Sequence, residues 1–583
     1  MPSDPLLYAG MPEAPRSVRG LDFAPRGDVF PSPADWRDAV FYQLMVDRFD
    51  DGEDHPAYDP ATAKRGRDLK QGGVFQGGTL RGITRRLDYL KNLGCNALWI
   101  SPPFKQRQDE PGAYHGYAIQ DFLAIDPRFG TTEDLQELVR ECHRRGIYVV
   151  LDIVINHAAD VFRYKGDPPY PYKPGGGTYE FSHWHKVTKS PDFERDDAVW
   201  PVELQNPDCF KRRGSIRDLA TEDEDEKVNG DFFSFKELNL SHPAVMDALV
   251  SAYKYWIAVA DVDGYRIDTL RNVEPNFCAR FCNAIREYAA RIGKHNFFLM
   301  GEVVGDDALL RKYVGDNTPP ENERVRYPLL DAVLDFPLYA ELDEIVKGER
   351  APGPLWKRYY EFRKYYRSFA LAGRYYVTFV DNHDQTCRPW RRFMHNAAGD
   401  ARLGVLGVGA VLTTLGIPCV YSGTEQGFDG GGDSDVYIRE AMFGGNWGAF
   451  DTTGVHFFDE QHPIYQGIAR VAAARAAEPA LRYGRQYFRE ISGDGEHFGT
   501  PTAGKATLAW SRVLDTQEIL VALNLDTQPR QDWVLVDPAL SGPGTRLRDL
   551  LDPGQNYAVE ATPGGAAVRL SLAPRTMVIL KHA

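Results

Sequence analysis

Three acidic residues of this sequence could act together on a glycosidic bond. Asp268, Glu302 and Asp384 each end a run rich in β-branched and aromatic residues, which is typical of a buried strand. In paired-carboxylate chemistry, one carboxylic acid protonates the leaving oxygen while another carboxylate attacks the anomeric carbon. A single carboxylate after a strand more often caps the following helix, and a structural charge network is the alternative for the whole group. Their coincidence at several strand ends favours the catalytic interpretation.

An arginine accompanies the first of these carboxylates. Arg266 precedes Asp268 by two residues, so in an extended strand both side chains project from the same face. We expect the guanidinium to keep Asp268 ionised by lowering its pKa, as a nucleophile requires. Glu302 must instead hold a proton near neutral pH, and we expect burial and the negative charges of Asp268 and Asp384 to raise its pKa.

Metal-dependent hydrolysis is the competing chemistry for histidines and aspartates at strand ends. It usually needs two or three histidines in one coordination sphere, and no H-x-H pair ends a predicted barrel strand; the "HWH" at 183–185 lies elsewhere. The seven cysteines are scattered without a C-x-x-C pair, so we expect no structural disulfide or zinc site. We therefore expect that the chemistry requires no cofactor.

The elements that position these residues alternate between strand-like runs and amphipathic helical stretches such as 131–146, a pattern typical of repeated βαβ units. Eight runs with crossovers predict an α/β fold, a closed (β/α)₈ TIM barrel. Its active site would lie at the carboxyl ends of the strands. The predicted strands fall within residues 39–49, 96–104, 147–157, 262–268, 297–302, 331–338, 375–384 and 417–425.

Changes of pattern along the chain predict four parts. Nearly eighty residues follow the third run, too many for a simple loop, and predict an inserted domain. Strand-like runs alone, broken by Gly, Pro and Asp, predict a C-terminal antiparallel β-sandwich. The acidic cluster at 221–226 is interpreted as a solvated loop rather than a metal site. The predicted parts are an N-terminal arm (1–35), the barrel (36–157 and 235–484), the inserted domain (158–234) and the sandwich (485–583).

The charge and hydrophobicity of the chain limit the kinds of molecule that it is expected to bind. The net charge of -14 disfavours nucleic acid, which prefers basic surfaces, and agrees with a neutral substrate. No apolar stretch reaches the roughly 18 residues of a membrane helix, and the N-terminal residues do not have the pattern of a signal peptide. We expect a cytoplasmic protein that binds no membrane, and the oligomeric state stays open.

Four motifs resemble those of the α-amylase superfamily, glycoside hydrolase family thirteen, and the resemblance extends over essentially residues 36–583. Secondary motifs agree with it: "GCNALWISP" (94–102), "FKELN" (235–239) and "GIPCVYSGTE" (416–425). The subfamily is not resolved. In order along the chain, the four motifs are "DIVINH" (152–157), "GYRIDTLRN" (264–272), "GEVVG" (301–305) and "FVDNHD" (379–384).

The resemblance implies a role for each matching carboxylate. Asp268 is similar to the family's nucleophile, Glu302 to its acid/base and Asp384 to the third carboxylate, which binds sugar hydroxyls. The residues that resemble the family's substrate-binding positions are Tyr117 as a stacking platform, His157 and His383 as hydrogen-bond partners of the sugar, Arg266 beside the nucleophile, and Arg271 on the acceptor side.

Departures from the family pattern leave parts of the specificity open. Many starch-degrading members carry Lys-His where this chain has Arg271 and Asn272, whereas Thr269 resembles members that act on α-1,4 bonds. Asn156 and the Asp-rich stretch 47–59 resemble places where some members hold a structural calcium, an ion that prefers such oxygen ligands. A solvated turn is the alternative explanation for the second stretch.

Together these features predict a retaining hydrolase of α-1,4-linked glucooligosaccharides, acting on short linear or cyclic maltodextrins. A transglycosylase would use the same residues and differ only in acceptor affinity and water exclusion. A third alternative is a non-catalytic carbohydrate-binding scaffold, which has no use for costly buried carboxylates.

Overall fold

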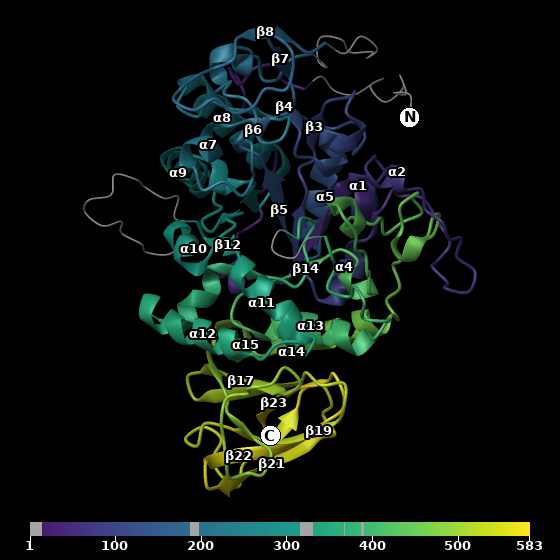
Figure 1. Cartoon of the computed structure of the whole chain (residues 1–583), viewed down its shortest axis with the longest axis vertical. Coiled ribbons are helices and arrows are strands. Elements are labelled where there is room, and N and C mark those ends of the chain that lie inside the picture. Colours follow the sequence, from purple (N-terminus) through teal and green to yellow (C-terminus); the bar gives the residue numbers. More distant parts are fainter. Residues whose placement is uncertain (1–13, 187–196, 315–329, 367, 386–389) are drawn as a thin grey trace.

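Eight parallel strands close into a barrel at the centre of the molecule (Figure 1). The computed structural model describes residues 14–186, 197–314, 330–366, 368–385 and 390–583. Around the barrel the strands follow the order β1-β14-β13-β12-β11-β10-β5-β2. Each predicted run contains one of them, so the predicted barrel is confirmed. The strands are β1 (Phe41–Leu44), β2 (Ala97–Ile100), β5 (Tyr148–Ile153), β10 (Gly264–Ile267), β11 (Phe298–Gly301), β12 (Ala332–Leu334), β13 (Tyr376–Thr378) and β14 (Ile417–Tyr421).

The interior of the barrel changes from apolar to charged along the strands. Phe41, Val150 and Phe298 belong to an apolar cluster that fills the barrel near the strand starts. Gly264 leaves room there, because a Cβ at this position would lie 2.6 Å from the Phe298 carbonyl oxygen. Two residues further along β10, on the same face, the buried Arg266 enters the interior. The charged groups therefore gather toward the carboxyl ends of the strands.

Helices surround the barrel and connect its strands. The predicted helix at 131–146 is present as α5, and a capping box between Thr131 and Asp134 defines its start. The main helices are α3 (Leu80–Arg85), α4 (Leu87–Leu93), α5 (Thr132–Arg144), α8 (Pro243–Ala260), α9 (Pro275–Arg291), α10 (Asp307–Tyr313), α11 (Phe336–Val346), α12 (Gly353–Tyr365), α13 (Ala401–Thr413), α14 (Pro463–Ala477) and α15 (Pro479–Tyr483). Within the part of the chain that the structure describes, no helix has both the length and the apolarity needed to cross a bilayer.

Short elements fill the long stretch between β5 and α8, at the end of the molecule opposite the C-terminal sheet (Figure 1). They are β6 (His157–Ala158), β7 (Phe162–Tyr164), β8 (Phe181–Trp184), α7 (Glu224–Asn229) and β9 (Lys236–Glu237). Residues 222–225 of the acidic cluster are exposed, as predicted, but the prediction of a loop was wrong for 224–226, which begin α7 after its cap Asp223. Arg213 binds Asp225 at 2.8 Å and Arg217 binds Glu226, so these acidic residues hold the segment together.

The N-terminal segment 14–35 lies on the barrel without forming a helix or strand. The ring of Phe30 stacks on His143 of α5, with ring centroids 4.1 Å apart. Tyr288 of α9 donates a hydrogen bond to the Phe23 carbonyl at 2.8 Å. These contacts show that residues 14–35 pack against helices of the barrel, whereas residues 1–13 of the predicted arm lie outside the described residues.

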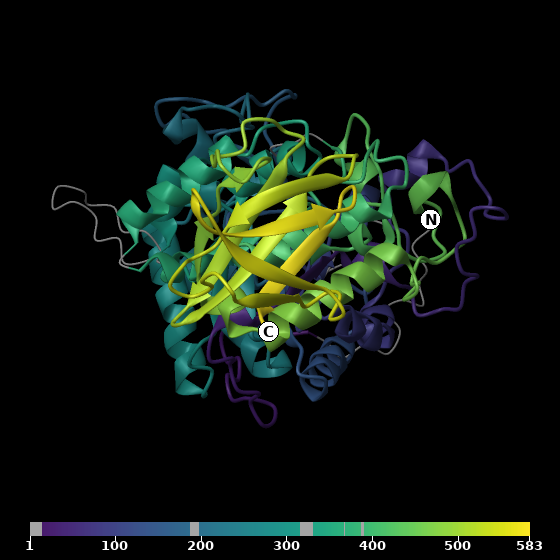
Figure 2. The ribbon, with the colours of Figure 1, turned by 90° about the horizontal axis from the view of Figure 1, so that it is seen from below.

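The C-terminal part forms an antiparallel sheet beneath the barrel (Figures 1 and 2). Its order is β15-β17-β18-β23-β20-β21-β22-β19-β16, and both halves contribute to one apolar core. Arg512 joins it to the barrel by donating to the Thr413 and Thr414 carbonyls at 2.8 and 2.7 Å. The strands are β15 (Arg485–Phe488), β16 (Ile491–Ser492), β17 (Thr507–Leu514), β18 (Gln517–Asn524), β19 (Arg530–Leu535), β20 (Arg546–Asp549), β21 (Asn556–Thr562), β22 (Gly565–Leu572) and β23 (Met577–His582).

Candidate active site

The candidate site is built around the guanidinium of Arg266, which is fully buried. Its Nη1 donates to Asp268 Oδ1 at 2.6 Å and to Asp152 Oδ1 at 2.9 Å. Its Nη2 lies 3.0 Å from Glu302 Oε2 and forms an ion pair with that carboxyl. One cation therefore serves three carboxyls, which come from the neighbouring strands β5, β10 and β11 and their ends.

Asp268 and Glu302 lie close together because their strands pair in register. Ile267 of β10 pairs with Gly301 of β11, so the next residue of each strand stands beside the other. Both carboxyls contact terminal nitrogens of one planar guanidinium, which keeps the contacting oxygens within about 8 Å of each other. The carboxyl pairs of glycosidases are separated by roughly 5 to 9.5 Å. The predicted pair is therefore brought together on the scale that this chemistry needs.

The residue after Asp268 is strained, and its backbone contacts the second carboxyl. Thr269 has a φ of 43°, a conformation that β-branched residues rarely adopt and that costs roughly 1–3 kcal/mol. In this conformation its N–H donates to Glu302 Oε2 at 2.9 Å. The strain thus accompanies a backbone donor aimed at the carboxyl of Glu302.

Asp384 joins the site through a second arginine, which sequence reasoning missed. Arg439 donates from Nη2 to Asp384 Oδ1 at 2.8 Å and from Nε to the His383 carbonyl at 2.9 Å. His383 Nε2 lies 3.0 Å from the other oxygen, Asp384 Oδ2. Arg439 is buried but lies in the long connection after β14, outside any strand or helix of regular period. No local pattern could therefore have indicated it.

Burial and the shared cation set the proton affinities of the central carboxyls. Burial raises the pKa of Glu302 to about 7, helped by the charges of Asp268 and Asp384, in agreement with the prediction. The prediction of a lowered pKa for Asp268 was wrong, because burial raises this pKa to about 7 although Arg266 opposes it. Burial also raises the pKa of Asp152 to about 6. One guanidinium divided among three buried carboxyls cannot keep all three ionised.

Asp384 differs from the other carboxyls. Burial would raise the pKa of Asp384, but its contacts with His383 and Arg439 and the charge of Arg266 hold it well below the usual range. Asp384 is therefore ionised at neutral pH, while the pair formed by Asp268 and Glu302 titrates near neutrality. Such a separation of proton affinities is typical of sites that combine acid and electrostatic roles.

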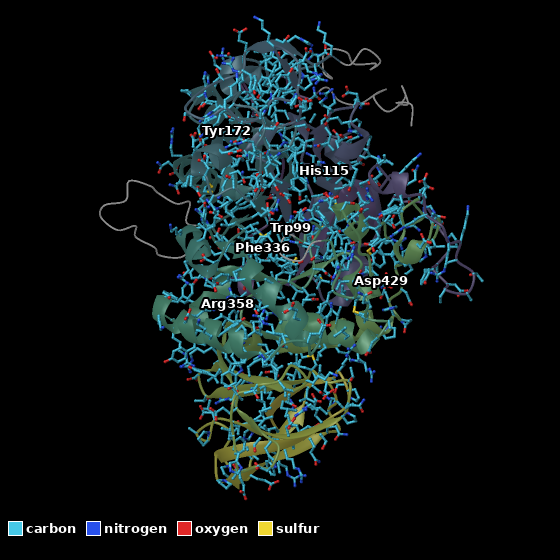
Figure 3. All side chains as sticks on the ribbon, in the orientation of Figure 1. Trp99, His115, Tyr172, Phe336, Arg358 and Asp429 are labelled. Carbon is cyan, nitrogen blue, oxygen red and sulfur yellow. The ribbon has the colours of Figure 1, made fainter. Side chains whose placement is uncertain are left out.

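Aromatic and histidine side chains border the carboxyls. The Tyr117 hydroxyl donates to Asp152 Oδ2 at 2.9 Å and lies 2.6 Å from His383 Nε2. Trp99, in the middle of the molecule in Figure 3, donates from Nε1 to the same Asp152 oxygen at 3.0 Å. Gln43 lies 2.9 Å from His383 Nδ1. Trp99 and Gln43 were not predicted, although both lie on predicted barrel strands.

His157 lies beside the backbone of Tyr117. Its Nε2 is 3.2 Å from the Tyr117 carbonyl, and its ring stacks on Phe235 with centroids 4.7 Å apart. Burial lowers the pKa of His157 to about 4, so the ring is neutral near pH 7. The structure thus brings Tyr117, His157 and His383 together with the central carboxyls.

Arg271 stands apart from this group. It lies on the short helix η6 (Leu270–Asn272) that follows β10, and its guanidinium binds Glu224 of α7. The contacts of the Arg271 side chain are therefore with α7 and not with the central carboxyls.

The predicted calcium ligand has part of the environment that the ion needs. Asn156 Oδ1 and Glu237 Oε1 are buried without a hydrogen-bond partner, and Asn156 Nδ2 donates to the other Glu237 oxygen at 2.8 Å. Two free oxygens fit a calcium site but are fewer than the six to eight that the ion takes. Among the described residues, no group of three or more His, Cys, Asp or Glu side chains could hold a metal. Calcium at Asn156 remains a prediction.

The second calcium candidate, within 47–59, is occupied by protein groups. Asp47 accepts hydrogen bonds from Arg48 and from the backbone of Gln76 and Gly77. Asp50 pairs with Arg86.

Six cysteines are buried free thiols, and the seventh, Cys387, lies outside the described residues.

A closed parallel barrel with a carboxyl pair at the ends of β10 and β11 is an arrangement that occurs in glycoside hydrolases. The family model of the alpha-amylase catalytic domain matches residues 43–443, well over half of the chain. The chain therefore belongs to the alpha-amylase family, whose members include hydrolases and transferases of sugars.

Similar proteins support this assignment. A beta/alpha-amylase of Paenibacillus polymyxa is 32% identical over 94% of this chain, which spans 38% of that protein's length. A cyclomaltodextrinase of a Bacillus species is 29% identical over 89% of the chain and 79% of its own length. The crystal structure of an Anoxybacillus alpha-amylase superposes with a TM-score of 0.67 at 26% identity, covering 94% of this chain and 99% of that one.

Proposed function

We propose that this protein is a retaining α-glucoside hydrolase that cleaves α-1,4-linked glucooligosaccharides, namely short linear or cyclic maltodextrins. The observation that carries the proposal is the contact of Asp268 and Glu302 with the single guanidinium of Arg266. A nucleophile and an acid must reach one anomeric centre from neighbouring positions. The similarity to a cyclomaltodextrinase supports maltodextrins as the substrate class.

In the first step, Asp268 attacks the anomeric carbon while Glu302 gives its proton to the glycosidic oxygen. The bond from carbon to the leaving oxygen breaks, a glycosyl ester forms on Asp268, and the shortened sugar leaves with the proton. The step requires one proton shared by the two carboxyls, and burial supplies this by raising the pKa of each to about 7. The 2.6 Å bond from Arg266 favours the ionised form of Asp268 within the pair.

In the second step, Glu302 acts as a base. It removes a proton from water as the water oxygen attacks the same carbon, and the ester bond to Asp268 breaks; each step inverts this carbon, so the configuration is retained overall. Asp384 stays ionised and accepts hydrogen bonds from sugar hydroxyls, with His383 and His157 beside it. The ring of Tyr117 offers an apolar face to the C–H face of the sugar.

A glucanotransferase is the alternative within the same chemistry, because a sugar hydroxyl can replace water in the second step. The two activities differ in acceptor affinity and in the exclusion of water. A non-catalytic carbohydrate-binding scaffold is disfavoured, because buried carboxyls destabilise the fold and a protein that only binds sugar does not need them.

The proposal is tested by product analysis. The protein is incubated with maltooligosaccharides, cyclodextrins, maltose, isomaltose, sucrose and trehalose, and products are resolved by length and by anomer using NMR. We expect shortened maltodextrins whose new ends appear first as the α-anomer. Release of the β-anomer would exclude the retaining mechanism, and no turnover of any sugar would favour the scaffold. Near-normal rates in Asp268→Ala or Glu302→Gln would overturn the site assignment.

A further inference from the structure

The short helix η6 connects the acid/base residue to α7. On one side, the Leu270 N–H donates to the Glu302 carbonyl at 3.0 Å. On the other side, Arg271 binds Glu224 with both terminal nitrogens, Nη1 to Oε2 at 3.0 Å and Nη2 to Oε1 at 2.7 Å. Asn272 adds a hydrogen bond to the Lys227 carbonyl at 2.9 Å. Helix α7, in the upper half of Figure 1, is thus attached to the backbone that flanks Glu302.

Helix η6 borders the acceptor side of the site, and this placement rests on the proposed function. The group that protonates the leaving oxygen must stand beside the leaving sugar, and the acceptor enters where that sugar left. The N–H of Thr269, which directly precedes η6, donates to Glu302 Oε2 at 2.9 Å, so η6 begins beside the carboxyl that would face the leaving sugar and the acceptor. The side chains of Arg271 and Glu224 are 23% and 60% exposed, so an entering sugar can reach both.

We propose that Glu224 competes with the acceptor sugar for the guanidinium of Arg271, and that this competition sets the ratio of transfer to hydrolysis. When Arg271 is paired with Glu224, two of its five N–H donors point to α7 and are withheld from an acceptor. When the pair opens, the same donors can hold the hydroxyl groups of an acceptor sugar beside Glu302. A better-held acceptor replaces water more often in the second step.

The strength of the pair makes such competition feasible. A bidentate bond between guanidinium and carboxylate is stronger than a bond to a neutral hydroxyl, so Glu224 dominates when no sugar is bound. The Glu224 side of the pair is nevertheless open to water, and ion pairs that water reaches contribute little and are screened by salt. A sugar that offers two hydroxyls can therefore displace the carboxylate. We expect the pair to change the ratio of transfer to hydrolysis by about two- to fivefold.

The experiment measures this ratio for the full chain with a maltooligosaccharide donor and a high concentration of maltose as acceptor. We expect Glu224→Gln to raise transfer relative to hydrolysis by about two- to fivefold, and Arg271→Ala to lower it. The double variant should behave like Arg271→Ala, because the competition needs the Arg271 guanidinium and does not involve the second partner of Glu224, Lys227 at 3.3 Å. Added salt should raise the ratio in the wild type but not in Arg271→Ala. The matched control is Glu222→Gln, whose side chain is 92% exposed and pairs with Lys227 at 3.9 Å.

The alternative is that the ion pair only holds α7 in place as a wall of the acceptor site. In that case Glu224→Gln and Arg271→Ala would lower the ratio equally, which would overturn the competition. An unchanged ratio in an active Glu224→Gln variant would overturn it as well and leave the proposed hydrolase intact. A larger effect from Glu222→Gln would assign the change to the net charge around the start of α7 and would overturn the competition. Absence of any turnover by the wild type would instead refute the proposed function, and the inference with it.

Discussion

Replacing Asp268 by asparagine should abolish turnover and yet stabilise the fold at neutral and alkaline pH. Burial raises the pKa of Asp268 to about 7, well above the value near 3.9 of an unfolded aspartate. The folded chain therefore binds this proton more tightly than the unfolded chain does. The stability that the site contributes is fully present below about pH 4 and is lost as pH rises toward 7.

The size of the effect follows from the proton affinity. A tenfold change in affinity corresponds to about 1.4 kcal/mol, so ionising Asp268 in the fold costs at most on the order of 4 kcal/mol. Asparagine avoids this cost and keeps the shape of the side chain. Arg266 does not lose all its partners, because Asp152 and Glu302 still contact it. For a chain of this length, 4 kcal/mol corresponds to a rise of about 3 °C in the unfolding midpoint.

The assay compares thermal unfolding midpoints of the wild type and Asp268→Asn from pH 4 to pH 8 at constant ionic strength. We expect the advantage of the variant to grow between pH 4 and 7 and to stay constant above. Asp384→Asn is the control of opposite sign, because contacts with His383 and Arg439 lower the pKa of Asp384 and its ionised form stabilises the fold. If Asp268→Asn lowered the midpoint at pH 8, Arg266 would keep Asp268 ionised and the argument from burial would fail.

Three further predictions follow from the same geometry. Glu302→Gln should remove the alkaline limb of the pH profile of kcat/KM, since the substitution removes the acid whose pKa burial raises to about 7. If the alkaline limb persists in this variant, a group other than Glu302 is the acid. Arg439→Met should lower kcat/KM by about tenfold or more, because it removes the cation that holds Asp384 ionised and in place. Arg439→Lys should restore part of the rate, whereas an unchanged kcat/KM in Arg439→Met would reduce Arg439 to a packing role. If Asn156 holds calcium, EDTA should lower the unfolding midpoint of the wild type and leave Asn156→Ala unchanged; metal analysis that finds no calcium would remove the prediction.

Much of the fold could be predicted from local patterns. The eight strand-like runs contain the barrel strands because buried parallel strands require continuous apolar sequence, which is visible without a structure. The meeting of Asp268 and Glu302 could be predicted for the same reason, since the ends of adjacent parallel strands lie at one edge of the barrel. The antiparallel C-terminal sheet followed from alternating runs separated by turn residues.

The sequence by itself therefore determined which residues stand at the mouth of the barrel, because position along a strand fixes the face and the end at which a side chain lies. Only the tertiary structure decided how charge is shared among them. Arg439 reaches Asp384 across 55 residues, and Glu224 reaches Arg271 across 47, and no periodic pattern encodes such contacts. The proton affinity of Asp268 depends on burial and on the division of Arg266 among three carboxyls, quantities that exist only once the chain has folded.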